Sequence, residues 1–432
     1  MIRKYLPRHD RLRQKLTYMG ISAVITLAFS TQLLAEQKSE IFLTLALSLK
    51  RGFEVNPALQ VLNEKVESEK TLIRSQYWLD NPRFGLMREN MGPTNTLMIS
   101  QEIRFPMKYF YSGSLQSTKV QEKEFEYKEK KLALRKEIIT TYYNLNVAKK
   151  ILDLLRAQKE TLREIARIAE SRYGAGLTPQ QDEMKAHSEQ SQIESELLMA
   201  EQEVDTEEFR LRPVLALENS SILKIATEEL STPKLPKFKN SNEDLALLIV
   251  KYSPAIKKFQ KNLEKMEHEK TLALLNYFPD FMISYKKPFG SNADSQAYSV
   301  SVEMQIPLWF FMKQTAEVSS ASHLVLEAEK ELYGMQLEQQ NEVSSLAAKV
   351  QRRFQLIGLY ESGIIPQALG TLNSSRSAYR AGKANFIELL DSERSYYGTQ
   401  IASYRTLAEY VSMLTELEEK VGVSLSSLPF LE

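Results

Sequence analysis

An ordered internal repeat constrains the fold of this chain more than any other feature. Six landmarks recur in the same order in its two halves: Pro57 as Pro254, Pro82 as Pro279, Glu102 as Glu303, Pro106 as Pro307, Tyr173 as Tyr379, and Gly176 as Gly382. Because the order is kept, the sequence predicts a duplication. Each half is expected to contain a helix, two strands joined by a loop, a long helix, a tip and a second helix.

The segment from Ala297 to Pro307 alternates strictly between apolar and polar residues. Tyr298, Val300, Val302 and Met304 fall on one parity, with serine, glutamate and glutamine on the other. A period of two is typical of a strand, because successive side chains leave opposite faces. Such a strand fits a half-buried soluble sheet, and equally a membrane barrel with lipid outside and water inside.

The first half predicts a matching strand pair and a long helix. Strand-like patterns cover Arg83–Arg88 and Leu97–Phe105, and the segment from Ser114 to Tyr173 holds no proline or glycine. Within that segment a seam recurs at spacings of three and four: Ala148, Ile151, Leu155, Gln158, Leu162, Ile165 and Ala169. This spacing indicates a coiled coil of about 60 residues, roughly 90 Å long. A mostly helical segment is expected over Glu40–Leu79, interrupted near Gly52 and Asn56.

The sequence predicts a secretory signal peptide over residues 1–35. A basic region is followed by an apolar run, Met19–Phe29, and by cleavage after Ser30 or Ala35. The alternative, a membrane anchor, is disfavoured because this run is shorter than the ~20 residues that a spanning helix needs. The 432 residues carry 56 basic and 55 acidic side chains, which gives no sign of nucleic-acid binding. Without cysteine the chain has no disulfide and no lipidated N-terminal cysteine.

Four strands per chain are too few to close a barrel, since about eight is the minimum with a filled interior. A spanning sheet must close, because open edges in lipid leave backbone groups unpaired. Three copies would supply twelve strands, and all the long helices would extend to one side of them. The sequence therefore predicts a trimeric conduit. Taken singly, the helices also fit a coiled-coil rod and the strands a soluble sheet.

The tip segments carry a resemblance to a known family. Arg172–Leu177 and Tyr379–Lys383, with Asn385–Asp391 after them, resemble the outer-membrane efflux proteins, the TolC-like trimeric channels of Gram-negative bacteria. The likeness covers residues 40–423, and Ser100–Pro106 looks most like the heavy-metal efflux branch.

That resemblance implies a fold and a set of partners. The fold would be α+β, with long α-helices forming a periplasmic helical barrel and four β-strands per chain in a trimeric twelve-stranded outer-membrane β-barrel. Expected partners are two sister copies, outer-membrane lipid, a periplasmic adaptor and, directly or through it, an inner-membrane pump. The expected division is a channel domain over 36–432, with repeats over 40–217 and 241–423, a linker over 218–240 and a tail over 424–432.

The resemblance also assigns candidate residues. The periplasmic constriction would contain Asp182, Tyr379, Glu388 and Asp391; Glu388 and Asp391 are three apart, so they share one helix face. The adaptor would contact the tips: Gly174, Ala175, Gly176, Leu177, Ala381, Gly382 and Lys383. Tyr298, Val300, Val302 and Met304 would face lipid. The simpler alternative for the two carboxylates is a solvated helix face.

No catalytic motif is present, so we expect no enzyme activity and no cofactor. The four histidines, His9, His187, His268 and His323, are scattered, so no tight metal site is expected. The substrate stays open between metal ion, drug and protein. The alternative function is a periplasmic coiled-coil adaptor or scaffold, which carries one helical hairpin rather than two beside paired strands.

Overall fold

The computed structural model describes residues 40–88, 95–218, 222–225, 232–234, 242–290 and 297–425. The predicted signal peptide, both strand-connecting loops and most of the predicted linker and tail lie outside these residues. The described residues divide into two compact units, one made of residues 40–44, 217–218 and 222–225, the other of the remaining described residues.

The smaller unit is built on two short strands. β1 (Glu40–Leu43) pairs in parallel with β4 (Ile222–Ile225), Glu40 opposite Ile222. The prediction of helix from Glu40 onward is therefore wrong at its start, and the segment expected to be a linker contributes a strand. Both runs are rich in β-branched or aromatic residues. Their pairing spans most of the first repeat, which local periodicity cannot show.

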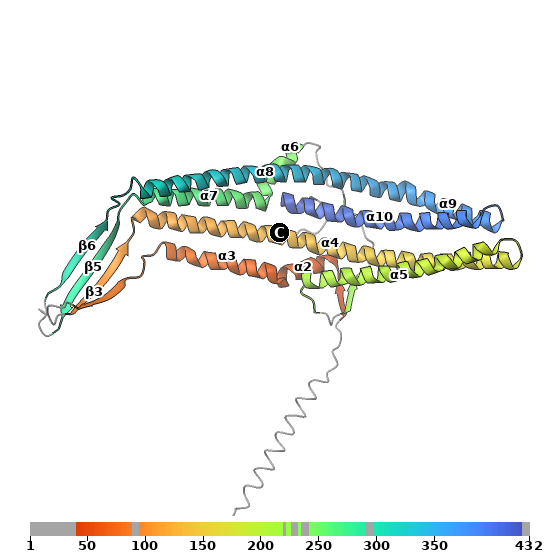
Figure 1. The fold of residues 1–432 in the computed structure, drawn as a ribbon, viewed down its shortest axis with the longest axis horizontal. Coiled ribbons are helices and arrows are strands. Elements are labelled where there is room, and N and C mark those ends of the chain that lie inside the picture. The colour runs from red at the N-terminus through yellow and green to blue at the C-terminus, as the bar shows by residue number, and fades with distance from the viewer. Residues whose placement is uncertain are drawn as a thin grey trace, which may run out of the picture. The chain divides into compact units, whose positions relative to one another are not determined.

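The larger unit contains the long helices of both repeats (Figure 1). The first repeat supplies α2 (Leu45–Val55), α3 (Pro57–Gln76), α4 (Pro106–Gly174) and α5 (Gln180–Val214). The second supplies α6 (Asn242–Tyr252), α7 (Pro254–Leu275), α8 (Lys313–Leu359), α9 (Ile365–Arg380) and α10 (Phe386–Val421). The 69-residue α4 begins at Pro106, earlier than the predicted Ser114, because proline suits the first helical position.

The predicted interruption near Gly52 is also corrected. α2 continues through Gly52, where a Cβ atom would lie 2.4 Å from Cδ1 of Ile138. Glycine is thus required by the close approach of α2 to α4 rather than by a break. The break comes at Asn56, whose Oδ1 accepts a hydrogen bond of 3.0 Å from the Ala58 amide and caps α3.

The strands form one antiparallel sheet in the order β2-β3-β5-β6. Their bounds are β2 (Arg83–Arg88), β3 (Asn95–Ile103), β5 (Asp280–Phe289) and β6 (Ser299–Gln305). Each repeat contributes one hairpin, as predicted, and β3 pairs with β5 to join the two. This order leaves β2 and β6 at the edges of the sheet.

The predicted coiled-coil seam of α4 is confirmed. Leu155, Gln158, Leu162, Ile165 and Ala169 are buried, and Ile151 is partly buried against the same core. α4 packs against α5, α3, α7 and α10, so it is the central helix of the unit. Near the tips this core also takes in residues of α9 and α10 from the second repeat.

Pro366 lies within a helical sequence pattern, where a proline is expected to kink or break the helix, and the structure confirms an irregularity there. A π-helical turn, η1 (Tyr360–Ile364), separates α8 from α9, and Pro366 is the second residue of α9. Proline has no amide hydrogen, and its ring crowds the carbonyl four residues earlier, here that of Ser362. The wider π turn accommodates that carbonyl without ending the helix.

Candidate functional site

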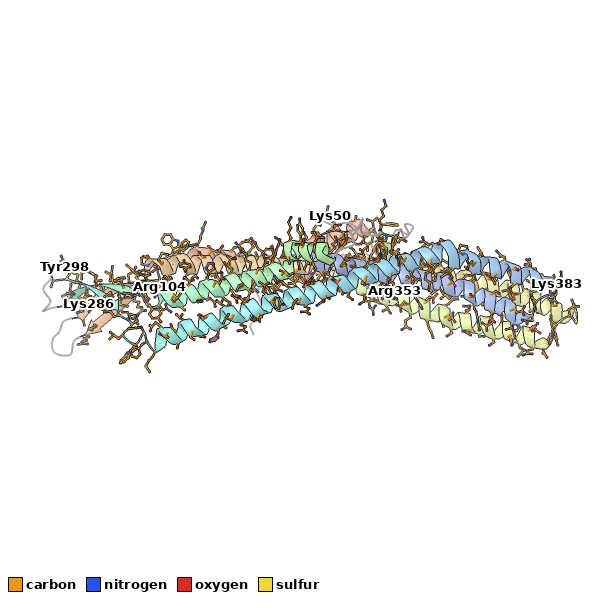
Figure 2. The ribbon with its side chains drawn as sticks, turned by 90° about the horizontal axis from the view of Figure 1, so that it is seen from above. Lys50, Arg104, Lys286, Tyr298, Arg353 and Lys383 are labelled. Carbon is orange, nitrogen blue, oxygen red and sulfur yellow. The ribbon has the colours of Figure 1, made fainter. Side chains whose placement is uncertain are left out.

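The candidate residues lie at the two ends of the larger unit. Lys383, in a helical tip, and Tyr298, beside the sheet, mark opposite ends of it (Figure 2). The α4–α5 turn and the α9–α10 turn form the tips, and the four-stranded sheet forms the other end.

Both tips end their helices in the same way. Gly176 has a φ of 71° and Gly382 a φ of 74°, the left-handed region that glycine adopts without strain. The amide of Leu177 donates to the Arg172 carbonyl at 2.9 Å, and the amide of Lys383 to the Ala378 carbonyl at 2.9 Å. These are Schellman turns, which satisfy the last helical carbonyls. A glycine at the end of each long helix is expected where the chain must reverse, and the structure confirms this for Gly176 and Gly382.

The two tips are fastened to each other by Arg172, a residue that sequence reasoning did not single out for this role. Its Nη1 donates to the carbonyl oxygens of Tyr379 at 3.0 Å and Arg380 at 3.3 Å. Its guanidinium carbon also lies 5.1 Å from the centre of the Tyr379 ring. A cation at the C-terminus of α9 is favoured by the helix dipole. The position equivalent to Arg172 in the second repeat is Ala378, which has no side-chain donor. The second repeat therefore cannot make the corresponding hydrogen bonds to the first.

Tyr379 is packed rather than hydrogen-bonded. Its side chain is 1% exposed, its ring centre lies 5.7 Å from that of Phe386, and its hydroxyl has no hydrogen-bond partner among the described residues. Burial and the nearby Asp182 charge raise the pKa of Tyr379. Partial burial raises the pKa of Asp182, against the influence of Lys185 and Arg172. The structure thus brings Tyr379, Asp182 and Arg172 together.

Glu388 and Asp391 are both exposed on α10, as their spacing predicted. Glu388 also takes part in a helix cap. Its amide donates to Oδ1 of Asn385 at 2.8 Å, and Nδ2 of Asn385 donates to its Oε1 at 3.1 Å. Asp182 is the third residue of α5, and Glu388 is the third residue of α10. The helix dipole stabilises a negatively charged side chain at such a position in the first turn. A structural role therefore accounts for part of this acidic pattern.

Sequence reasoning did not single out Glu393, a further carboxylate on α10. Glu393 is 0% exposed, and its Oε2 accepts a hydrogen bond of 3.2 Å from Gln158 of α4, while its Oε1 has no partner among the described residues. Burial raises the pKa of Glu393 to about 7, although the hydrogen bond from Gln158 opposes the shift. The nearby Glu189 carboxylate raises this pKa further, and Arg394 lowers it.

The register of the sheet sorts its side chains by polarity, because residues paired across strands share a face. One row reads Phe84, Ile99, Tyr285 and Val300, and a second reads Ile103, Phe281 and Met304. The opposite face carries the row Arg83, Ser100, Ser284 and Ser301. Val300 and Val302 are 60% and 67% exposed in the single chain. The alternation predicted for one strand thus extends across the four strands in these rows. Gln101, in the row of Ile283 and Val302, is a polar residue on the apolar face, and Met98 and Met282 lie on the opposite face.

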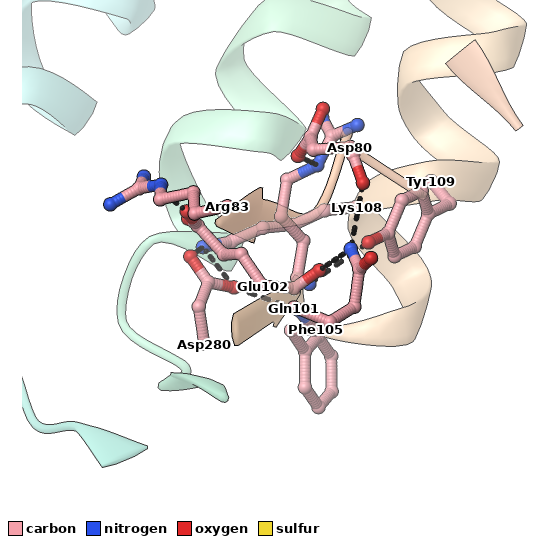
Figure 3. A network of polar contacts seen from close by, with 9 residues as sticks. Asp80, Arg83, Gln101, Glu102, Phe105, Lys108, Tyr109 and Asp280 are labelled. Atoms are coloured by element: carbon pink, nitrogen blue, oxygen red, sulfur yellow. Dashed lines mark hydrogen bonds and ion pairs between the residues drawn. The ribbon is translucent and has the colours of Figure 1, made fainter. Parts of the chain in front are cut away.

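A polar network joins the sheet to the helices (Figure 3). Asp280 is the first residue of β5. Its carboxylate accepts a hydrogen bond of 2.7 Å from the Phe105 amide and forms an ion pair of 2.8 Å with Nζ of Lys108. Gln101 donates to the Asp80 carbonyl at 2.7 Å, and Arg104 forms an ion pair with the Asp80 carboxylate at 3.3 Å. Gln101 and Arg104 of the Ser100–Pro106 motif thus bind Asp80 within the first repeat, whereas the Phe105 amide and Lys108 make the contacts to Asp280 of the second repeat.

The described residues contain no cluster of three or more His, Cys, Asp or Glu side chains that could hold a metal ion. Among the described helices, none combines the length and apolar character that crossing a membrane requires.

Comparisons with known proteins agree with this fold. The family model "Outer membrane efflux protein" matches residues 112–217 and 249–423. The outer membrane protein TolC of Vibrio cholerae serotype O1 is 18% identical over 83% of this chain and 84% of its own. The cobalt-zinc-cadmium resistance protein CzcC of Cupriavidus metallidurans is 20% identical over 90% of this chain and 91% of its own.

The same fold occurs in solved structures. The outer-membrane channel OprN superimposes with a TM-score of 0.75 at 14% identity, over 88% of this chain and 90% of that one. The family match decides between the two functions left open by the sequence, against a periplasmic adaptor and for a non-enzymatic channel. This chain belongs to the outer membrane efflux protein family: it is an efflux channel of tripartite systems, placed in the outer membrane with a periplasmic helical extension.

Proposed function

We propose that three copies of this chain assemble into one exit duct, each giving its four-stranded sheet to a twelve-stranded barrel. The observation that carries this proposal is the register, which aligns the row Phe84, Ile99, Tyr285 and Val300 on one face of all four strands. The edges β2 and β6 fit it, because each would pair with the opposite edge of a sister copy. The apolar side chains of Tyr298, Val300, Val302 and Met304 face lipid, and the opposite face of β6, with Ser301, Glu303 and Gln305, faces a water-filled lumen.

Two substitutions on neighbouring residues test this assignment. Val302→Arg places a charge on the lipid face, which costs roughly 2–4 kcal/mol near mid-membrane, so less channel should assemble in the outer membrane. Ser301→Arg places the same charge in the lumen, where it should leave assembly intact and reduce cation conductance in planar bilayers. Equal loss of assembly in both variants would remove the assignment of the two faces.

The helical end of the duct forms the periplasmic constriction. In three copies, Glu388 and Asp391 become stacked carboxylate rings, which attract cations and repel anions. Their exposure on α10 supports this role, and Asp182 and Tyr379 lie beside the Arg172 fastening that holds the tips together. The competing interpretation, a solvated face with one helix cap, predicts the same geometry and differs only in ion selectivity.

The tips are the docking surface for a periplasmic adaptor, which links the duct to an inner-membrane pump. All seven tip residues are exposed: Gly174, Ala175, Gly176, Leu177, Ala381, Gly382 and Lys383. Leu177 is 67% exposed, although an apolar side chain in water gains from a partner. Leu177→Asp should weaken capture of the channel by its adaptor, whereas Leu198→Asp, at a 65% exposed leucine of α5 away from the tips, serves as the matched control.

Divalent metal cations are the cargo class we favour. The support is the likeness to a protein named for cobalt-zinc-cadmium resistance and the acidic character of the proposed constriction. Deleting the gene should make cells sensitive to these metals. Sensitivity to drugs with unchanged metal tolerance would reassign the cargo and leave the channel itself unaffected.

A further inference from the structure

The segment between β6 and α8 forms an exposed apolar turn, Leu308–Met312. Its five residues are leucine, tryptophan, two phenylalanines and methionine, each between 51% and 70% exposed. Ile306, two residues before Leu308, is 58% exposed. Contiguous apolar surface of this kind is unfavourable in water and marks a contact with another apolar phase.

Hydrogen bonds fix the backbone of this turn. The amide of Phe310 donates to the Pro307 carbonyl at 3.2 Å, and the amide of Met312 donates to the Trp309 carbonyl at 3.0 Å. The ring centres of Trp309 and Phe311 lie 6.2 Å apart. The apolar side chains are therefore presented by an ordered backbone, so little entropy is lost when a partner covers them.

The first repeat has an ionic contact at the equivalent place. At the offset of 201 residues that relates Pro106 to Pro307, Trp309 corresponds to Lys108. Lys108 is 8% exposed and is paired with Asp280 at 2.8 Å. α4 has already begun at Pro106, whereas α8 begins only at Lys313. The second repeat thus replaces an inward ion pair with an outward apolar turn.

The position of the turn indicates which phase covers it. The exposed row of Val300, Val302 and Met304 continues with the same parity into Ile306 and then directly into the turn. Trp78 and Trp309 are the two tryptophans of the chain, and each lies in a connection between a helix and the helix-side end of the sheet. Tryptophan concentrates at the level of lipid headgroups. Lys313, which follows the turn, is exposed and of the charge that lipid phosphates attract.

We propose that the Leu308–Met312 turn is a membrane-interface anchor that inserts into the periplasmic leaflet of the outer membrane, with Trp309 at the boundary between headgroups and acyl chains. The proposal rests on the lipid-facing assignment of the sheet given above. It adds a lipid contact outside the strands, on one repeat only. The competing occupant is a second copy of this chain, which would cover the turn with protein instead of lipid.

Tryptophan fluorescence in nanodiscs tests the proposal. In full-length protein, Trp78→Phe leaves Trp309 as the single tryptophan. The nanodiscs contain phospholipids brominated either near the headgroup end or near the methyl end of the acyl chains, because bromine quenches tryptophan on contact. Two reference variants, both also carrying Trp78→Phe and Trp309→Phe, hold their single tryptophan at Val302 (Val302→Trp) or on α8 at Tyr333 (Tyr333→Trp).

The expected pattern is specific. Trp309 emission should fall to roughly half or less with bromine near the headgroups and fall less with deep bromine. Val302→Trp should show the opposite order, and Tyr333→Trp, about 30 Å along α8 from Lys313, should not be quenched. Quenching of Val302→Trp with none of Trp309 would overturn the anchor and leave the channel proposal standing. Absence of quenching at Val302→Trp would contradict the lipid face itself.

Discussion

The guanidinium of Arg172 donates a hydrogen bond of 3.0 Å to the carbonyl oxygen of Tyr379, a residue 207 positions later in the chain. Arg172 lies in the last turn of α4, and Tyr379 lies in the last turn of α9. One side chain of the first repeat therefore completes the end of a helix in the second repeat. The two tips are coupled directly, close to the proposed constriction.

Removing that coupling should loosen the tips. Arg172→Ala deletes hydrogen bonds from a charged donor, a class that contributes about 1.5–3 kcal/mol where it is shielded from water. We expect amide hydrogen exchange over residues 378–383 to become roughly tenfold faster, with exchange in β3 and β5 unchanged. Arg380→Ala, which removes a neighbouring arginine but not the fastening, is the control. Unchanged exchange in Arg172→Ala would mean that the contact does not hold the tips.

Two glycine-to-alanine substitutions at the α4–α5 tip should change the stability of the protein in opposite directions. Gly176→Ala forces alanine to a φ of 71°, which costs about 1 kcal/mol although nothing lies within 4 Å of the new Cβ. Gly174→Ala, two residues earlier, lies within α4 with an equally open surrounding and should stabilise by about 0.5–1 kcal/mol. Thermal unfolding midpoints distinguish the two. A rise for Gly176→Ala would show that the turn does not need positive φ.

Glu393 should make stability depend on pH. Its pKa in the folded protein is about 7, above the ordinary 4.5, so the folded state keeps a proton that the unfolded chain has lost. Stability should therefore fall as the pH rises from about 4.5 to 7 and be level with respect to this group above 7. Glu393→Gln keeps the shape without the charge, and should stabilise the protein at pH 8 by about 1–3 kcal/mol while changing little at pH 4.5.

The difference between the unfolding midpoints at the two pH values measures this effect. Glu203→Gln, which removes an exposed carboxylate further along α5, is the control. A midpoint difference in Glu393→Gln as large as that of the unaltered protein would exclude Glu393 as its source.

The carboxylate rings are tested by ion selectivity. The double variant Glu388→Gln and Asp391→Asn removes two charges per copy but keeps hydrogen-bonding capacity at the α10 cap. Cation preference in planar bilayers should decrease several-fold. Glu203→Gln, an exposed carboxylate on α5, should leave it unchanged. Unaltered selectivity in the double variant would assign Glu388 to helix capping alone.

Features that repeat locally could be predicted from the sequence. Alternation over Tyr298–Met304 indicated the strand, spacing of three and four indicated the α4 seam, and glycine after each long helix indicated the turns at Gly176 and Gly382. Each of these features depends only on residues that are close together in the sequence, within about two helical turns or a few strand positions. The periodicity of the sequence is therefore sufficient to predict them. The duplicated order then indicated that both halves share one architecture.

Contacts between distant segments could not be predicted in this way. The pairing of β1 with β4, the Arg172 fastening and the burial of Glu393 each depend on a partner more than 150 residues away. Glu393 has an ordinary helical neighbourhood in sequence, and only the approach of α4 removes it from water. Gly52 was interpreted as a break for the same reason, since its requirement comes from Ile138 on another helix.

The central claim is that the sheet of one chain is completed by sister copies around a membrane-spanning pore. Native mass spectrometry of the full-length protein, released from detergent micelles, measures the number of copies directly. We expect a particle of three chains that precipitates when detergent is withdrawn. A single chain that remains dissolved and folded without detergent would contradict it.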